Sequence, residues 1–129
     1  MIVVDASVLA PAVADRGEDG QRIRQRLRGE TVIGPDLLRL EVVSVLRRHA
    51  GNGALTDQQA DDAVDDLLAF PITVLPTFPL LGRAWELRHN VSVYDASYIA
   101  LAEAVGQPLL TADRRLANAP GLRCDVEIL

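Results

Sequence analysis

Two acidic residues follow short apolar runs far apart in the chain. Asp5 comes directly after Ile2–Val4, and Asp113 follows the run that ends at Thr111. Each acid has a hydroxyl two positions away, Ser7 beyond Asp5 and Thr111 before Asp113. Such runs predict buried strands, and ligands of parallel sheets usually bind outside the carboxyl ends of the strands. We therefore expect both acids at one sheet edge, unless each merely caps the helix after it.

Two further acids stand beside apolar patterns. Asp95 falls in the first turn of a helix predicted from Val93, where the helix dipole favours an anion and lowers the pKa of a carboxyl group. Glu41 must reach solvent or find a partner, because it borders the apolar helical stripe of Leu38, Val42, Val45 and Leu46. In contrast, the acids after Thr56 indicate a solvated helix face: Asp57, Asp61, Asp62, Asp65 and Asp66.

Asp5, Glu41, Asp95 and Asp113 would repel one another if they met in one crevice. Binding hard divalent cations is the simplest way to keep such carboxylates ionised. No His or Cys accompanies them, so the set favours Mg²⁺ or Mn²⁺ over Zn²⁺. Two such ions about 4 Å apart would activate a water and stabilise the departing oxygen of a phosphodiester. The four acids therefore suit metal-dependent phosphodiester hydrolysis.

Apolar runs alternate with helical patterns along the chain, which predicts an α/β sandwich around a mainly parallel sheet. Thr56 and Gln59 match a capping box that opens one helix. Trp85 is expected in the core, and Pro35 suits the first turn of the helix that carries Glu41. The predicted strands are 2–4, 31–33, 72–75, 109–111 and 124–129; the predicted helices are 6–14, a segment around 23–27, 35–49, 56–70, 80–89, 93–106 and a short one ending near 118.

The composition is that of an ordinary globular protein, with 49% hydrophobic and 24% charged residues among 129. This length suits a single domain over residues 1–129. No apolar run approaches the roughly 18 residues of a membrane span, and no signal peptide is evident, so we expect a cytoplasmic protein. The net charge of −5 argues against holding nucleic acid by bulk attraction. It excludes neither a nuclease whose bound cations reverse the local charge nor a protein with a basic partner.

Four short motifs together carry a resemblance to a known family. They occur in the order Val4-Asp5-Ala6-Ser7, then Glu41 with Val45-Leu46-Arg47, Tyr94-Asp95-Ala96-Ser97-Tyr98, and Leu110-Thr111-Ala112-Asp113. This ordered set resembles the PIN-domain ribonucleases over essentially the whole chain. The small single-domain form is similar to the VapC-type toxins of bacterial toxin-antitoxin modules.

The resemblance implies a PIN-like three-layer α/β/α fold and Mg²⁺- or Mn²⁺-dependent endonucleolytic cleavage of RNA, leaving a 5′-phosphate and a 3′-hydroxyl. Asp5 and Asp95 would be direct metal ligands, with Glu41 and Asp113 holding metal-bound water. The supporting hydroxyls would be Ser7 and Thr111, which would bond a carboxylate or the scissile phosphate. The resemblance also implies a homodimer and a cognate antitoxin that inserts into a groove near the site.

The chain departs from the family at one point. Some members carry a further acid or Asn shortly after the last Asp, whereas Arg114 and Arg115 stand here, which makes a second metal site less secure. These arginines either reach RNA phosphate or face solvent. Two other interpretations stay open: phosphotransfer on Asp5, although Ser7 occupies the place where such a site wants a second Asp, and a catalytically inert PIN-like interaction module.

Overall fold

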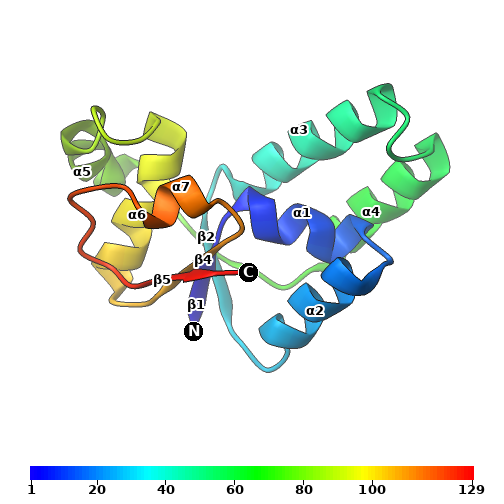
Figure 1. The fold of residues 1–129 in the computed structure, drawn as a ribbon, viewed down its shortest axis with the longest axis horizontal. Coiled ribbons are helices and arrows are strands. Elements are labelled where there is room, and N and C mark those ends of the chain that lie inside the picture. The colour runs from blue at the N-terminus through cyan, green and yellow to red at the C-terminus, as the bar shows by residue number, and fades with distance from the viewer.

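The computed structural model describes residues 1–129 and is built around a five-stranded sheet in the order β3-β2-β1-β4-β5 (Figure 1). Every neighbouring pair is parallel. The chain lays β2 and β3 on one side of β1, then crosses to place β4 and β5 on the other. The crevice beside β1 is therefore a topological switch point. The strands are β1 (Ile2–Val4), β2 (Val32–Pro35), β3 (Thr73–Leu75), β4 (Leu109–Thr111) and β5 (Val126–Ile128).

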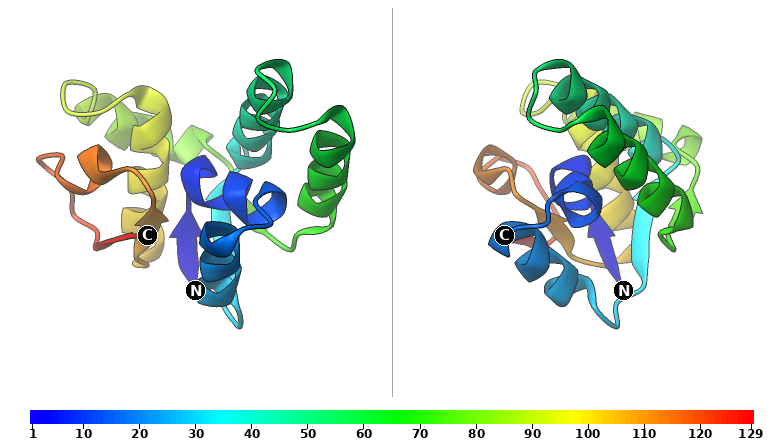
Figure 2. Two further views of the ribbon diagram at one scale, coloured as in Figure 1. Left: turned by 45° about the vertical axis from the view of Figure 1, so that its right-hand side comes forward. Right: turned by 90° about the vertical axis from the view of Figure 1, so that its right-hand side faces the viewer.

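Helices cover both sides of the sheet, which confirms the predicted α/β layers. On one side α1 (Ala6–Ala14) packs against α2 (Glu18–Leu27), α3 (Leu38–Gly51) and α4 (Asp57–Ala69). On the other lie the 3₁₀ helix η1 (Phe78–Leu80), α5 (Leu81–Glu86) and α6 (Val93–Val105), and the short α7 (Arg114–Ala117) follows β4. In the left view of Figure 2, α3 and α4 stand apart from α5 and α6, with α1 between them.

The hydrophobic core joins both layers through the central strands and α6. All three residues of β1 are fully buried, and so is the run from Ala96 to Ala102 in α6. A helix that is apolar on all sides must be enclosed, and α6 lies between the sheet and α5. This burial fixes the end of α6 that carries Asp95.

The helix that carries Glu41 begins at Leu38 and not at Pro35, which corrects the sequence prediction. Pro35 is the last residue of β2, where it pairs with Leu75. The next N–H, that of Asp36, donates to the Leu75 carbonyl at 2.9 Å, so pairing with β3 continues beyond the proline. A proline at a strand end is tolerated because the pairing does not need its missing N–H.

The prediction that Trp85 lies in the core was wrong. Trp85 is 64% exposed, and the buried side chains here are Ala84 of α5 and Leu87, which follows the helix. The guanidinium of Arg88 lies 4.3 Å from the centre of the indole ring. One side of the ring is therefore covered by a cation and not by the protein interior.

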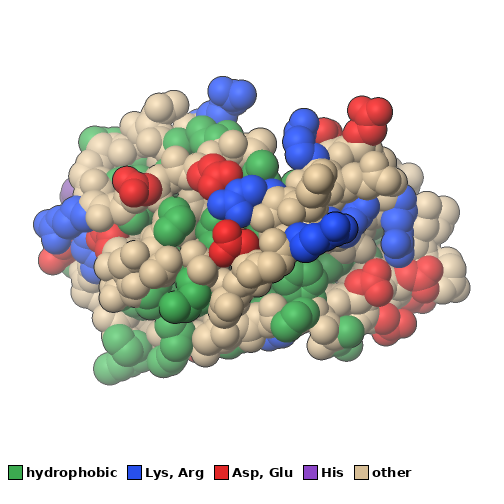
Figure 3. Space-filling view, turned by 90° about the horizontal axis from the view of Figure 1, so that it is seen from below, with side chains coloured by type: hydrophobic (Ala, Val, Ile, Leu, Met, Phe, Trp, Pro, Cys, Tyr) green, Lys and Arg blue, Asp and Glu red, His purple; other side chains and the backbone are tan.

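Two other predictions about helices hold. The capping box at the start of α4 is present, with the Thr56 hydroxyl accepting from the Gln59 N–H and the Gln59 side chain accepting from the Thr56 N–H. The five acids of α4 are exposed on its surface. The face seen from below Figure 1 mixes acidic, basic and hydrophobic side chains (Figure 3). No helix is both long and apolar enough to cross a membrane.

Candidate active site

A cavity of about 720 Å³ opens at the carboxyl edge of the sheet. It brings together the four acids that the sequence singled out: Asp5, Glu41, Asp95 and Asp113 all line it, and Ser7 lines it beside them. They come from the start of α1, from α3, from α6 and from the β4–α7 turn. Thr111 lies beneath this lining, fully buried at the end of β4.

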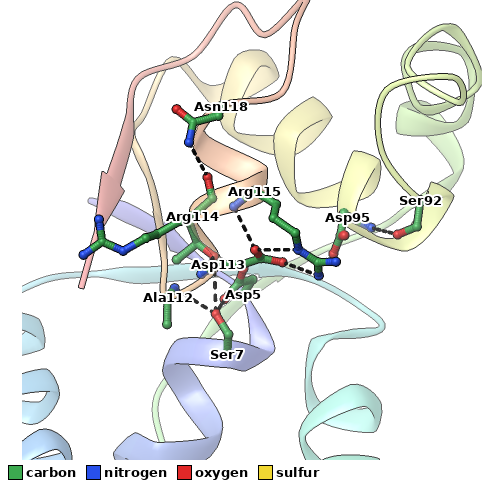
Figure 4. Close-up of polar contacts among 10 residues, drawn as sticks. Asp5, Ser7, Ser92, Asp95, Ala112, Asp113, Arg114, Arg115 and Asn118 are labelled. Atoms are coloured by element: carbon green, nitrogen blue, oxygen red, sulfur yellow. Dashed lines mark hydrogen bonds and ion pairs between the residues drawn. The ribbon is translucent and has the colours of Figure 1, made fainter.

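Asp5 is held by two hydroxyl groups. Ser7 Oγ and Thr111 Oγ1 each donate to a different carboxylate oxygen of Asp5, both at 2.5 Å. Each hydroxyl in turn accepts a backbone N–H. Ser7 accepts that of Ala112 at 2.9 Å (Figure 4), and Thr111 accepts that of Asp113 at 3.1 Å. Each N–H group occupies a lone pair of its hydroxyl oxygen, so the proton of each hydroxyl is directed at Asp5. Asp5 occupies the N-cap position of α1 without a side-chain cap, so capping does not explain it.

Asp113, in contrast, is a true helix cap. Its Oδ1 accepts the backbone N–H of Arg115 at 2.9 Å at the start of α7. The Arg115 guanidinium also donates to both carboxylate oxygens, Nε at 3.3 Å and Nη2 at 3.1 Å. Hydrogen bonding to Arg115 lowers the pKa of Asp113. Asp113 therefore caps α7, as the capping interpretation predicts, and it also forms an ion pair with Arg115.

Asp95 and Glu41 face the cavity from opposite layers of the fold. Ser92 caps α6 by accepting the Asp95 N–H at 3.1 Å, so the Asp95 carboxylate is not needed as a cap. Glu41 Oε1 accepts the hydroxyl of Tyr98 at 3.1 Å. Tyr98 is only 1% exposed and follows Asp95 by three positions on α6. Sequence reasoning assigned Tyr98 no role, although this spacing places it on the same helix face as Asp95.

Three of the four carboxyl groups are harder to ionise than usual. Burial is the main cause that raises the pKa of Asp5, Glu41 and Asp95. Repulsion adds to it, since the charge of Asp95 acts on both Asp5 and Glu41, and that of Asp113 acts on Asp95. The lowered pKa expected for Asp95 at a helix start is thus wrong, because burial outweighs the favourable position.

The donor set suits a hard divalent cation but does not form a closed chelate. No three His, Cys, Asp or Glu side chains are grouped closely enough to hold an ion as they stand. Their present partners explain this, because hydroxyls hold Asp5, Tyr98 holds Glu41 and Arg115 faces Asp113. An open set of carboxylate oxygens fits Mg²⁺ or Mn²⁺, since Mg²⁺ usually keeps several water ligands and uses one or two carboxylates.

The cavity continues away from the acids along α1 and α3. Small and apolar side chains line its middle, among them Ala10, Ala14, Val45 and Leu55. Basic side chains line it further along: Arg16, Arg48 and His49. Arg48 is seven residues beyond Glu41, or about 10 Å along the helix axis. The cavity is thus acidic at one end and, apart from Asp15, carries basic side chains at the other, an arrangement for which the sequence pattern gave no signal.

The PIN domain family model matches residues 2–122. The chain belongs to the PIN domain family. Ribonuclease VapC1 of Mycobacterium tuberculosis is 40% identical to it over 98% of this chain and 96% of VapC1. Ribonuclease VapC12 of the same organism is 35% identical over 100% of this chain and 99% of VapC12. The family resemblance carried by the four motifs is therefore confirmed.

A solved structure shares the fold of this PIN domain at low sequence identity. VapBC2 from Rickettsia felis, bound to a DNA fragment from its promoter, superposes with a TM-score of 0.71 and 14% identity. The match covers 100% of this chain and 99% of that chain. The α/β arrangement around the parallel sheet is thus shared with this solved VapBC2 structure.

Proposed function

We propose that this PIN domain is an endoribonuclease that hydrolyses RNA with Mg²⁺ or Mn²⁺ held by Asp5, Glu41, Asp95 and Asp113. The observation that carries the proposal is the meeting of four carboxylates in one cavity, three of them with a raised pKa. Only Asp113 among them pairs with a cationic side chain. The relatives VapC1 and VapC12 are ribonucleases by name, which supports RNA as the substrate.

We assign the four acids different roles in metal and water binding, according to how firmly the protein holds each side chain. Asp5, fixed by two hydroxyls, and Asp95, across the cavity, are our proposed direct ligands. Glu41 keeps Oε2 free of protein hydrogen bonds, so that oxygen can orient a water molecule. Asp113 supports a second water from the opposite side. When bound, the divalent cation would lower the pKa of a water and offset the charge of the phosphodiester.

We further propose that the chain is the toxin of a toxin-antitoxin module and that its antitoxin occupies the cavity. The acidic end would attract a basic side chain, and the apolar middle would take apolar side chains of the same segment. The net charge of −5 favours a basic partner. A VapBC complex among the structural relatives agrees with this role.

We also propose that the chain forms a homodimer through η1 and α5. Phe78, Leu81 and Trp85 are 82%, 51% and 64% exposed and recur at helical spacing. Three large apolar side chains on one exposed face indicate an interaction surface. We call them the α5 stripe.

Calorimetric titration of Mn²⁺ into the wild type and into Asp5→Asn, with RNA cleavage followed in parallel, tests the nuclease proposal. We expect saturable binding by the wild type, weakened at least tenfold by Asp5→Asn because a ligand charge is lost, and a fall in cleavage of about 100-fold or more. Asp65→Asn, which removes an exposed and unpaired acid of α4, should change neither. A folded wild type that neither binds Mn²⁺ nor cleaves RNA would favour the inert interaction module.

A further inference from the structure

Arg115 is the one cationic side chain paired with an acid of the site. Both guanidinium bonds go to Asp113, and each reaches a different carboxylate oxygen. In Figure 4 the guanidinium lies over Asp113 on the side that faces Asp95. The charge of Arg115 also lowers the pKa of Asp95. Arg115 thus places a positive charge beside two of the proposed metal-binding acids, Asp113 and Asp95.

This pairing competes with a metal ion for the carboxylate of Asp113. A forked guanidinium occupies the oxygens that a cation or its water ligands would need. The pair is nevertheless easy to break, because the Arg115 side chain is 91% exposed and that of Asp113 is 29% exposed. Exposed ion pairs hold their partners weakly, so a divalent ion that also attracts Asp5 and Asp95 can displace the guanidinium.

A displaced Arg115 stays at the rim of the cavity, since its backbone is fixed at the start of α7. Its planar fork matches a phosphate as well as it matches a carboxylate. We propose that Arg115 exchanges partners: it neutralises Asp113 before the divalent cation binds, and it binds an RNA phosphate once that cation has replaced it. This inference rests on the nuclease function proposed above.

The neighbouring arginine provides a matched control. Arg114 is also exposed and carries the same charge, but its side chain makes no hydrogen bond or ion pair. In Figure 4 it extends to the opposite side, away from Asp113. Arg114→Gln and Arg115→Gln therefore change the net charge equally, and only Arg115→Gln removes the contact with Asp113.

Two measurements test the exchange. In calorimetric titrations without RNA, Arg115→Gln should bind Mn²⁺ up to about fivefold more tightly than the wild type, as expected for removal of an exposed competitor. In initial-rate assays on a fluorogenic random-sequence single-stranded RNA, the same variant should raise KM. In a plot of log KM against log salt concentration, the slope for this variant should be smaller than that of the wild type by about 0.7, the value for one lost phosphate contact on a single strand. Arg114→Gln should match the wild type in the metal titration and in the salt slope.

The outcomes separate the exchange from the function on which it rests. If the wild type binds Mn²⁺ and cleaves RNA, but Arg115→Gln behaves like Arg114→Gln in either measurement, the exchange is wrong. Weaker Mn²⁺ binding by Arg115→Gln would also overturn it. A wild type that neither binds Mn²⁺ nor cleaves RNA would overturn the nuclease proposal itself.

Discussion

The four site acids differ in how strongly the protein restricts them. Asp5 accepts two hydroxyl donors that are themselves fixed by backbone N–H groups. Glu41 has one side-chain partner, Tyr98, and Asp113 has the exposed Arg115. A metal site needs at least one rigid ligand, and partners behind a ligand set its orientation. We therefore expect Asp5 to be the anchor and the others to adjust around it.

Thr111→Val tests the anchor without changing the side chain's shape. The substitution removes one donor to Asp5 and leaves the Asp113 N–H without its acceptor. We expect kcat or Mn²⁺ affinity to fall by about 10- to 100-fold, and the free energy of unfolding to fall by about 1–2 kcal/mol. RNA cleavage and denaturant unfolding measure these effects. Thr73→Val on the exposed β3 should alter neither, and unchanged activity in Thr111→Val would contradict the anchoring role.

Glu41→Gln should make the metal-free protein more stable at neutral pH. Burial raises the pKa of Glu41, so the folded state favours the protonated form, and its contribution to stability is lost as pH rises through that raised pKa. Gln is neutral and can still accept the Tyr98 hydroxyl. We expect the free energy of unfolding to rise by less than about 1 kcal/mol at pH 7. The gain should disappear below about pH 4, where the wild-type Glu41 carboxyl group is protonated in both the folded and the unfolded state. Denaturant unfolding with a chelator at several pH values measures it, and a variant less stable at pH 7 would refute it.

At the scale of elements, a single ion-pair network joins α5 and α6 to the loop before β5. Arg83 donates to both oxygens of Glu103, at 2.8 and 3.1 Å, and to the Gly121 carbonyl at 2.6 Å. Glu103 also accepts the Arg123 N–H at 3.0 Å. The Arg83 and Glu103 side chains are largely buried, at 19% and 11% exposure. This network holds the layer that carries Asp95.

Glu103→Gln should therefore destabilise the fold by about 2 kcal/mol at pH 7, because it leaves the partly buried Arg83 with only the exposed Glu86 as a counter-ion. Burial opposes ionisation of Glu103, yet the hydrogen bonds from Arg83 and from the Arg123 N–H lower its pKa overall. The contribution to stability is thus present above the pKa of the unfolded state and lost as pH falls through the folded one. The difference between variant and wild type should shrink in acid.

Chemical unfolding from neutral to acidic pH measures this difference. Glu86→Gln is the control, since Glu86 is the exposed partner of the same arginine, at 61% exposure. It should cost less than about 1 kcal/mol. Equal losses for both variants would show that burial does not distinguish the two pairs.

Local patterns predicted the elements well where one physical cause dominates. A β-branched or leucine run followed by an acid marked β1 and β4, and the capping residues of α4 marked its start. The prediction failed at Pro35, because pairing with β3 is a property of the sheet. It failed at Trp85, because nothing in the helical spacing tells which face of α5 meets α6.

The sequence indicated the acids of the candidate site but not the side chains that pair with them. The four acids could be selected because each lies beside an apolar pattern, and all four line the cavity. The Tyr98–Glu41 bond joins helices from opposite layers, and the Arg115–Asp113 pair depends on where a side chain turns at the start of α7. Both depend on three-dimensional packing, which residue spacing does not encode.

At the scale of the whole molecule, the α5 stripe is the surface on which the proposed homodimer depends. Trp85→Glu places a charge in this apolar face and should convert the dimer to a monomer, because a buried unpaired charge is unfavourable at an interface. Analytical ultracentrifugation measures the change. Leu68→Glu, on an exposed position of α4, is the control. A wild type that is monomeric at all concentrations, or a dimer broken only by Leu68→Glu, would contradict this assignment.

The pairing of β1 with β4 also sets the order in which the protein becomes competent during synthesis. Asp5 is translated 106 positions before Thr111, whose hydroxyl is needed to orient it. Contacts this distant in sequence form late in folding. A nascent or prematurely terminated chain that stops before β4 would carry Asp5 and Glu41 without a working site. For an enzyme that cuts RNA, the topology itself thus delays activity until β4 has been translated.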